Sequence, residues 1–206
     1  MIVLGVHCAF SIHNHEPGAA ISINGKIVAC CEEERYIRNK EAYGKLPNES
    51  IRAALKLAKI NFNQINLIVS TGTTCKNFTT TLKKYFSDNF GCCPKIILVH
   101  HQLGHIAAAF YSSGFKEATC ISLDGFGDQK SGLIAEANLK NGVKKIEYVE
   151  LNNSLGNFYT LVTEYLGYAK GDEYKVMGLA AYGKNNLDFS KVIKLNSKYW
   201  NFDKSY

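Results

Sequence analysis

At the centre of the chain stands the stretch His100-His101-Gln102-Leu103-Gly104-His105, and an apolar run follows it. This pattern predicts a helix over residues 102–112. Positions four apart on a helix lie one above the other, so His101 and His105 can face a single metal ion. His100 is rotated by about 100° from His101 and precedes the helix, so it cannot join that pair.

A second stretch, Leu123-Asp124-Gly125-Phe126-Gly127, follows an apolar strand predicted over residues 118–123. Asp124 would leave the end of that strand as a third ligand, where Gly125 and Gly127 loosen the backbone. Two nitrogens and a carboxylate oxygen suit Fe, Mn or Zn better than Ca or Mg. The alternative is a surface or hydrogen-bonded histidine pair beside an ordinary Asp-Gly turn, and spacing alone does not separate the two.

Composition indicates a folded cytoplasmic protein. The chain has 206 residues, 46% of them hydrophobic, which is enough for a sizeable core in one domain or two small ones. The net charge of +6 is spread without a basic block, so nucleic acid is not an expected partner and anionic small molecules are slightly favoured. The seven Cys form no Cys-x-x-Cys motif and indicate reduced thiols. No apolar run reaches the ~18 residues of a membrane span.

Strands alternate with helices along the first half of the chain, which predicts an α/β fold with parallel strands covered by helices. Asn24-Gly25 predicts a hairpin, and Asn48 is the expected N-cap of a helix. Strands are expected at residues 2–9, 19–23, 26–31, 65–70 and 95–99, and helices at 48–60 and 78–86.

The second half continues with strands over residues 131–137 and 145–151, which we expect to be antiparallel. A helix is predicted over residues 155–166, and its aromatic face is typical of a core. A glycine-bounded turn and short helix occupy residues 171–183. The aromatic face consists of Phe158, Tyr159 and Tyr165.

Two polar segments of the first half are candidate sites. The loop over residues 11–18, with His13 and His15, joins the first strand to the hairpin. In folds of the actin and hexokinase kind, such a loop is where phosphate often sits. The pattern of the charged run over residues 32–40 favours a solvent-exposed edge of the fold.

Five motifs, in the same order, together resemble the O-carbamoyltransferases of the nodulation-factor, cephamycin and tobramycin type. They are residues 5–40, the His-His-x-x-x-His stretch, Leu123-Asp124-Gly125-Phe126-Gly127, Ser154-Leu155-Gly156 and residues 171–180. The resemblance covers nearly the whole chain. It implies a ribonuclease-H-like lobe of the actin/hexokinase (ASKHA) fold, with a mixed sheet flanked by helices. It also implies that carbamoyl phosphate and ATP give carbamoyl-adenylate, from which the carbamoyl group passes to the hydroxyl of a small-molecule acceptor.

The resemblance assigns roles to individual residues. The implied metal ligands are His101, His105 and Asp124, with Fe as the expected metal and Mn or Zn as alternatives. The implied catalytic residues are His15, at the carbamoyl-transfer centre, and Lys40, as a phosphate contact. The implied cofactor-binding residues are Gly125, Gly127, Glu173 and Lys175. Where the family has His-Asp-Ser, this chain has His15-Glu16-Pro17-Gly18, which would re-aim the loop.

The length of the chain limits these expectations. The family's second lobe and its C-terminal carbamoyl-phosphate domain have no counterpart here, so we expect a single N-terminal lobe over residues 1–206, with a frayed tail over 184–206. Such a chain would be inactive alone and completed by a second subunit, and would expose apolar residues near Phe158 and Met177. The alternative is a non-catalytic binding or regulatory module, truncated or from a split gene, that retains the metal-binding lobe.

Overall fold

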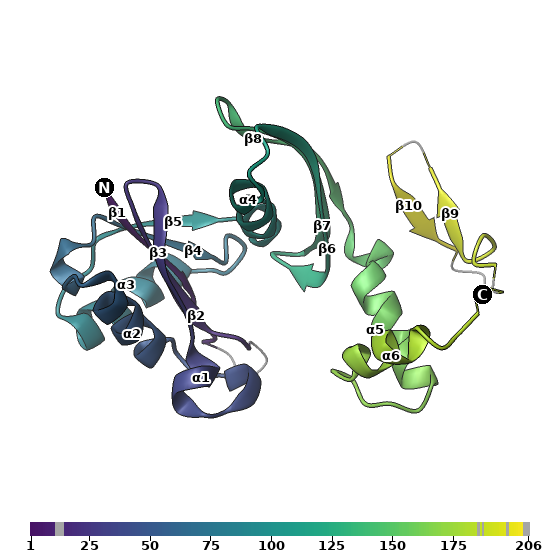
Figure 1. Ribbon diagram of the computed structural model, residues 1–206, viewed down its shortest axis with the longest axis horizontal. Coiled ribbons are helices and arrows are strands. Elements are labelled where there is room, and N and C mark those ends of the chain that lie inside the picture. Colours follow the sequence, from purple (N-terminus) through teal and green to yellow (C-terminus); the bar gives the residue numbers. More distant parts are fainter. Residues whose placement is uncertain (11–14, 185, 187, 197, 204–206) are drawn as a thin grey trace. The chain divides into compact units, whose positions relative to one another are not determined.

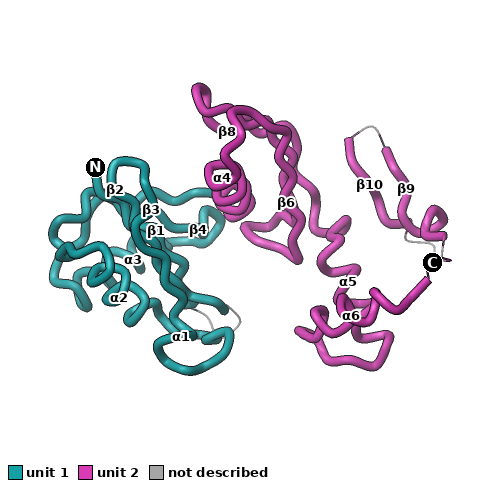
Figure 2. The backbone as a smooth tube through the Cα atoms, in the orientation of Figure 1, with its two compact units in different colours: residues 1–100 teal, residues 101–206 magenta. Residues whose placement is uncertain are grey.

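The computed structural model describes residues 1–10, 15–184, 186, 188–196 and 198–203. It divides the chain into two compact units, residues 1–100 and 101–206 (Figure 2). The sequence predicts a single lobe, because its alternation of strands and helices continues past residue 100 without a linker. Each unit contains at least one sheet of its own, and the single lobe over residues 1–206 stays a prediction.

Unit 1 contains a five-stranded mixed sheet with the order β3-β2-β1-β4-β5 (Figure 1). The strands are β1 Ile2–His7, β2 Gly18–Ile23, β3 Lys26–Glu32, β4 Leu67–Thr71 and β5 Lys95–Val99. β1, β2 and β3 pair antiparallel, whereas β4 pairs parallel with both β1 and β5. The predicted α/β sheet with parallel strands is confirmed.

The turn between β2 and β3 has the predicted chemistry. Asn24 and Gly25 have φ values of 50° and 83°, the left-handed conformation that a two-residue hairpin turn needs at both central positions. Ile23 pairs with Lys26 directly across it. The hairpin predicted from Asn24-Gly25 is confirmed.

Helices of unit 1 cover the sheet with apolar faces. They are α1 Glu33–Ile37, α2 Asn48–Ala58 and α3 Phe78–Phe90, with 3-10 turns η1 Lys40–Ala42 and η2 Phe62–Gln64. Ile51 of α2 and Phe86 of α3 are fully buried in one core with Leu4, Ile21 and Ile68 of the sheet. Burial of a side chain of this size contributes about 1.5–3 kcal/mol.

The start of α2 differs from the prediction. Asn48 is the first helical residue rather than the N-cap, and its side-chain oxygen accepts a hydrogen bond from the Tyr85 hydroxyl at 2.6 Å. The Glu33 carboxylate takes the capping role, accepting from the backbone N–H groups of Glu49 at 3.1 Å and Ser50 at 2.7 Å. Glu33 is only 2% exposed, so the charged run is not simply a solvated edge.

Unit 2 begins with α4 His101–Ser113, which packs on an antiparallel sheet of order β6-β7-β8. The strands are β6 Glu117–Gly127, β7 Lys130–Asn138 and β8 Gly142–Val149. Ile106 of α4 is buried against Leu133 and Ala135 of β7. Further on lie η3 Leu151–Asn153, α5 Leu155–Tyr165, α6 Glu173–Ala180, β9 Ile193–Leu195 and β10 Trp200–Phe202 (Figure 1). The predicted antiparallel pairing of β7 and β8 is confirmed.

Two expectations for the C-terminal part need correction. The aromatic face of α5 is not a core, since Tyr165 is 89% exposed and only Phe158 packs, stacking on Phe202 at 5.1 Å between ring centroids. The segment after Lys184 contains the β9–β10 hairpin instead of a frayed tail. Trp200 holds the hairpin because its indole N–H donates to the Asn153 carbonyl at 2.7 Å.

The predicted exposure of apolar residues on this part is confirmed around Met177, which is 66% exposed. Further exposed apolar residues of α5, α6 and the turns after them are Leu161, Leu166, Tyr174, Leu179 and Tyr182. In the described part of the chain, every helix is too short or too polar to cross a bilayer.

Replacement of Glu33 by alanine should destabilise unit 1. The change leaves two N–H groups at the start of α2 without their carboxylate, and loss of a helix cap costs about 0.5–2 kcal/mol. Urea denaturation followed by circular dichroism measures this loss. The neighbouring Glu32→Ala is the control, because Glu32 is exposed and pairs with Arg35 on the surface, where an ion pair contributes about 0–1 kcal/mol. Equal effects of both changes would contradict the capping role of Glu33.

Candidate metal centre

Three predicted ligands converge within unit 2. His101 and His105 lie one turn apart on α4, and Asp124 lies on β6. The distance from Asp124 Oδ2 is 2.9 Å to His101 Nε2 and 3.6 Å to His105 Nε2, and the two Nε2 atoms are 2.9 Å apart. The predicted convergence is confirmed.

The separations between these atoms fit a shared metal ion. Ligand atoms bound at about 2.1 Å and subtending 90° to 109° at the ion lie about 3.0–3.4 Å apart, close to the observed 2.9–3.6 Å. The Asp124 and His101 side chains are about a quarter exposed and that of His105 is about half exposed, so an ion can reach the cluster from solvent. The same atoms lie within hydrogen-bond distance of one another.

A break in the β6–β7 ladder places Asp124. Leu123 pairs with Gly132 and Gly127 pairs with Lys130, so β6 has two more residues than β7 between these pairs. Extra residues of this kind bend a strand and re-aim its side chains. The sequence predicts that the strand ends before Asp124, whereas the observed strand continues past it through this irregular segment.

The start of α4 is fixed by a side chain from the following turn. The Asp128 carboxylate accepts a hydrogen bond from the backbone N–H of His101 at 2.9 Å. Asp128 and Gln129 both have left-handed φ values, 49° and 62°, which the tight return from β6 to β7 requires. His100 precedes the first residue of α4, as the sequence predicts.

Two glycines admit close contacts around Asp124. A Cβ on Gly127 would lie 2.1 Å from Cδ2 of His101, and one on Gly156 would lie 2.7 Å from the backbone carbon of Asp124. Gly127 therefore makes room for the ligand imidazole. The buried Ser154 hydroxyl lies 2.8 Å from the carbonyl oxygen of Asp124 and caps α5, so the start of α5 is held against the ligand strand.

The electrostatics favour a cation at this place. Burial opposes ionisation of Asp124, but hydrogen bonds from His101 and His105 outweigh it and hold the pKa of the carboxyl well below its usual range. The hydrogen bond to Asp124 raises the pKa of His105 against the opposing effect of partial burial. Asp124 is therefore a carboxylate at neutral pH.

The predicted residues Glu173 and Lys175 lie on α6 and make local contacts. The Glu173 carboxylate accepts a hydrogen bond from Thr160 of α5 at 2.6 Å, and Lys175 pairs with Asp172 at 2.7 Å. A Cβ built on Gly125 would lie 3.4 Å from the side-chain oxygen of Asn157, which is an ordinary contact distance.

Unit 1 carries His15 and Lys40, and it brings their segments side by side. The backbone N–H of Glu16 donates to the Glu41 carbonyl at 2.6 Å, and the rings of His15 and Tyr43 are 5.1 Å apart. The other histidine of this loop, His13, lies outside the described residues.

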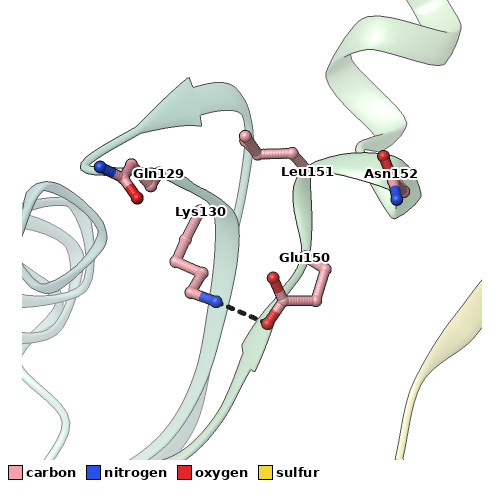
Figure 3. A pocket seen from close by; sticks show the side chains of 5 residues that line it. All are labelled: Gln129, Lys130, Glu150, Leu151 and Asn152. Carbon is pink, nitrogen blue, oxygen red and sulfur yellow. Dashed lines mark hydrogen bonds and ion pairs between the residues drawn. The ribbon is translucent and has the colours of Figure 1, made fainter.

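A shallow pocket of about 550 Å³ lies where β7 and β8 meet η3 (Figure 3). Lys130 and Glu150 point toward one another across it as an ion pair. The pocket is lined by Gln129, Lys130, Glu150, Leu151 and Asn152. None of the residues predicted from the sequence lines this pocket.

Sequence reasoning missed the residues that support the three converging side chains, although it named those three themselves. These are Gln102, which donates to Asp124 Oδ2 at 3.3 Å, and Asp128, together with Ser154 and Gly156, which it quoted only as parts of motifs. Their polar or glycine character was visible, but the partners lie 22 to 32 residues away.

Comparison with known proteins gives relatives over most of the chain. Nodulation protein NolNO of Sinorhizobium fredii is 33% identical over 191 residues, covering 82% of this chain and 28% of that protein. The uncharacterized protein MJ1051 of Methanocaldococcus jannaschii is 31% identical over 180 residues, covering 86% of this chain and 34% of that protein. The chain thus spans about a third of the length of these relatives.

A solved structure shares the fold. The activator of the 2-hydroxyisocaproyl-CoA dehydratase from Clostridium difficile, with bound ADPNP, superposes with a TM-score of 0.51 at 14% identity. The match covers 93% of this chain and 61% of that one. The fold is of the ASKHA type, a mixed sheet flanked by helices, as the resemblance implies.

The family is shown by a match over more than half of the chain. Residues 89–202, which include all three converging side chains, match the family model described as carbamoyltransferase N-terminus. The chain therefore belongs to the O-carbamoyltransferase family and corresponds to the N-terminal domain of that family.

Proposed function

We propose that the chain is the N-terminal part of an ATP- and metal-dependent O-carbamoyltransferase. The enzyme would pass a carbamoyl group from carbamoyl-adenylate to the hydroxyl of a small-molecule acceptor. The observation that carries the proposal is the convergence of His101, His105 and Asp124 in a chain of this family. The ADPNP bound to the activator of similar fold supports a nucleotide as the second ligand.

The proposed residues have three roles, which are metal binding, phosphate contact and proton transfer. His101, His105 and Asp124 would hold Fe, or Mn or Zn, which when bound supplies positive charge that polarises and orients a phosphoryl or carbamoyl oxygen. Lys40 would contact a phosphate, and His15 would hold or move a proton at the carbamoyl-transfer centre.

Glu173 and Lys175 on α6 are the proposed contacts to the nucleotide. Gly125, beside Asn157, would leave room for the nucleotide. Lys175 would exchange its surface partner Asp172 for phosphate oxygens, a small cost because the pair is solvated. Gly127, the other proposed cofactor-binding glycine, also gives room to the His101 ring.

The remaining length of the relatives would supply the rest of the enzyme. Catalysis needs groups placed on both sides of a substrate, and this chain spans 28% and 34% of its relatives. The exposed apolar side chains of α5 and α6 support a further lobe, in the same protein or in a second subunit, that would cover them. All seven Cys are free thiols, which is consistent with the proposed cytoplasmic location.

On its own, the purified chain should not turn over carbamoyl phosphate. We expect no carbamoyl-adenylate by mass spectrometry when metal, ATP and carbamoyl phosphate are added, because catalysis needs groups on both sides of a substrate and the chain spans only 28% and 34% of its relatives. The matched experiment adds the product of any reading frame directly downstream. Stoichiometric carbamoyl-adenylate from the chain alone would contradict this expectation.

Replacement of His101 by alanine should abolish metal binding, whereas His100→Ala should largely keep it. His101 supplies one of three protein ligands, so its loss should exceed the 10–100-fold weakening expected for a supporting residue. His100 precedes α4 and serves as the neighbouring imidazole control. Metal analysis of both purified variants measures the result. Loss of metal in His100→Ala with retention in His101→Ala would overturn the ligand assignment.

A methyl group on residue 127 should also weaken metal binding. In Gly127→Ala the Cβ would overlap the His101 imidazole, so the ring must move, and we expect a loss of at least about 10-fold in affinity. Titration calorimetry with Mn²⁺ checks this. Gly178→Ala is the control, because a Cβ there meets no atom within 4 Å. Equal affinities of the two variants would show that His101 can shift without loss.

A further inference from the structure

Gln102 is a buried polar side chain beside the ligands. It follows His101 on α4 but has no exposed surface, and it lies between the helix and the β6–β7 hairpin. A buried side-chain amide must find partners, because each unpaired polar group costs about 1–3 kcal/mol. Those partners show what Gln102 does.

The amide nitrogen of Gln102 meets two acceptors. Nε2 lies 3.3 Å from Asp124 Oδ2 and 3.2 Å from the backbone carbonyl oxygen of Lys130. Neither a carboxylate nor a carbonyl oxygen can donate, so a flipped amide would place oxygen against oxygen at both contacts. The network therefore fixes which end of the amide faces Asp124.

The amide oxygen is fixed from the other side. Gln102 Oε1 accepts a hydrogen bond from the Ser122 hydroxyl at 2.8 Å, and Ser122 is itself buried on β6. Ser122 lies two residues before Asp124, on the same strand. The amide is thus held at both ends by the strand whose carboxylate it contacts.

Both oxygens of the Asp124 carboxylate are then accounted for. Oδ1 accepts from the backbone N–H of Gly125 at 2.7 Å, and Oδ2 accepts from Gln102 while facing the two imidazoles. These two donors oppose rotation of the carboxylate. Because an amide is neutral, Gln102 orients the ligand without bringing a positive charge that would compete with a cation.

We propose that Gln102 is a positioning residue of the metal centre, which keeps the Asp124 carboxylate turned so that Oδ2 faces the ion between His101 and His105. This inference rests on the proposed function, because it presumes that the three side chains bind metal. It extends that proposal to the residue between the two ligand histidines and to Ser122 behind it.

The test uses Gln102→Met, which keeps the volume and loses both the donor and the acceptor. Titration calorimetry of the full chain with Mn²⁺, a redox-stable probe, gives the affinity below the unfolding temperature of each variant. We expect an affinity about 10–100-fold below wild type, the usual cost of removing a hydrogen-bond partner of a ligand.

A control separates positioning from general stability. Ile106→Val shortens a buried side chain of the same helix in the α4–β7 core, so it lowers the melting temperature without touching a polar partner of Asp124. We expect it to bind Mn²⁺ as wild type does. If Gln102→Met fails to fold, Ser122→Ala replaces it, with an expected loss of roughly fivefold, about that of one ordinary hydrogen bond.

Two different failures are distinguishable. Wild-type affinity in Gln102→Met or in Ser122→Ala, together with lost binding in His101→Ala, would overturn the role of Gln102 and leave the metal centre standing. Equal weakening in Ile106→Val would also overturn it, because the effect would then be general. Absence of Mn²⁺ binding by the wild-type chain would overturn both the metal centre and the role of Gln102.

Discussion

The contact between the Asp124 carboxylate and two imidazole nitrogens is the constraint on which the local structure of unit 2 depends. A partly buried carboxylate is costly unless it is hydrogen-bonded or paired with positive charge. Here the carboxylate faces the His101 imidazole on α4 and accepts hydrogen bonds from Gln102 and the Gly125 N–H. A helix start, an irregular strand segment and a buried amide all serve to keep one oxygen at one place.

Gly127 and Gly156 are needed because space around the Asp124 carboxylate is tight, and not because their backbone conformations require glycine. Neither Gly127 nor Gly156 has a positive φ, so neither is needed for a left-handed conformation. Each instead stands where a Cβ would overlap a ligand ring or the ligand's own backbone. Glycine at these two positions allows α4 and α5 to approach β6 closely. The sequence pattern around Asp124 does not by itself predict this close approach.

Local patterns in the sequence were sufficient to predict most elements and the convergence of the three side chains of the candidate metal centre. The Asn24-Gly25 hairpin and the one-turn spacing of His101 and His105 depend on neighbours within four residues, and both were predicted. The N-cap of α2 was missed because it comes from Glu33, 16 residues before the N–H of Glu49. The contacts of Gln102 were missed for the same reason, since its partners lie on distant segments.

The placement of the candidate residues separates metal binding from chemistry. The three converging side chains belong to unit 2 and come from one helix and the strand after it. His15 and Lys40 belong to unit 1, on adjacent segments. A site built within one unit needs only that unit to fold, because its affinity depends on local geometry. A reaction that also uses residues of unit 1 depends on how the two units are held, so the proposed metal binding would need only unit 2, whereas the proposed carbamoyl transfer would need both units.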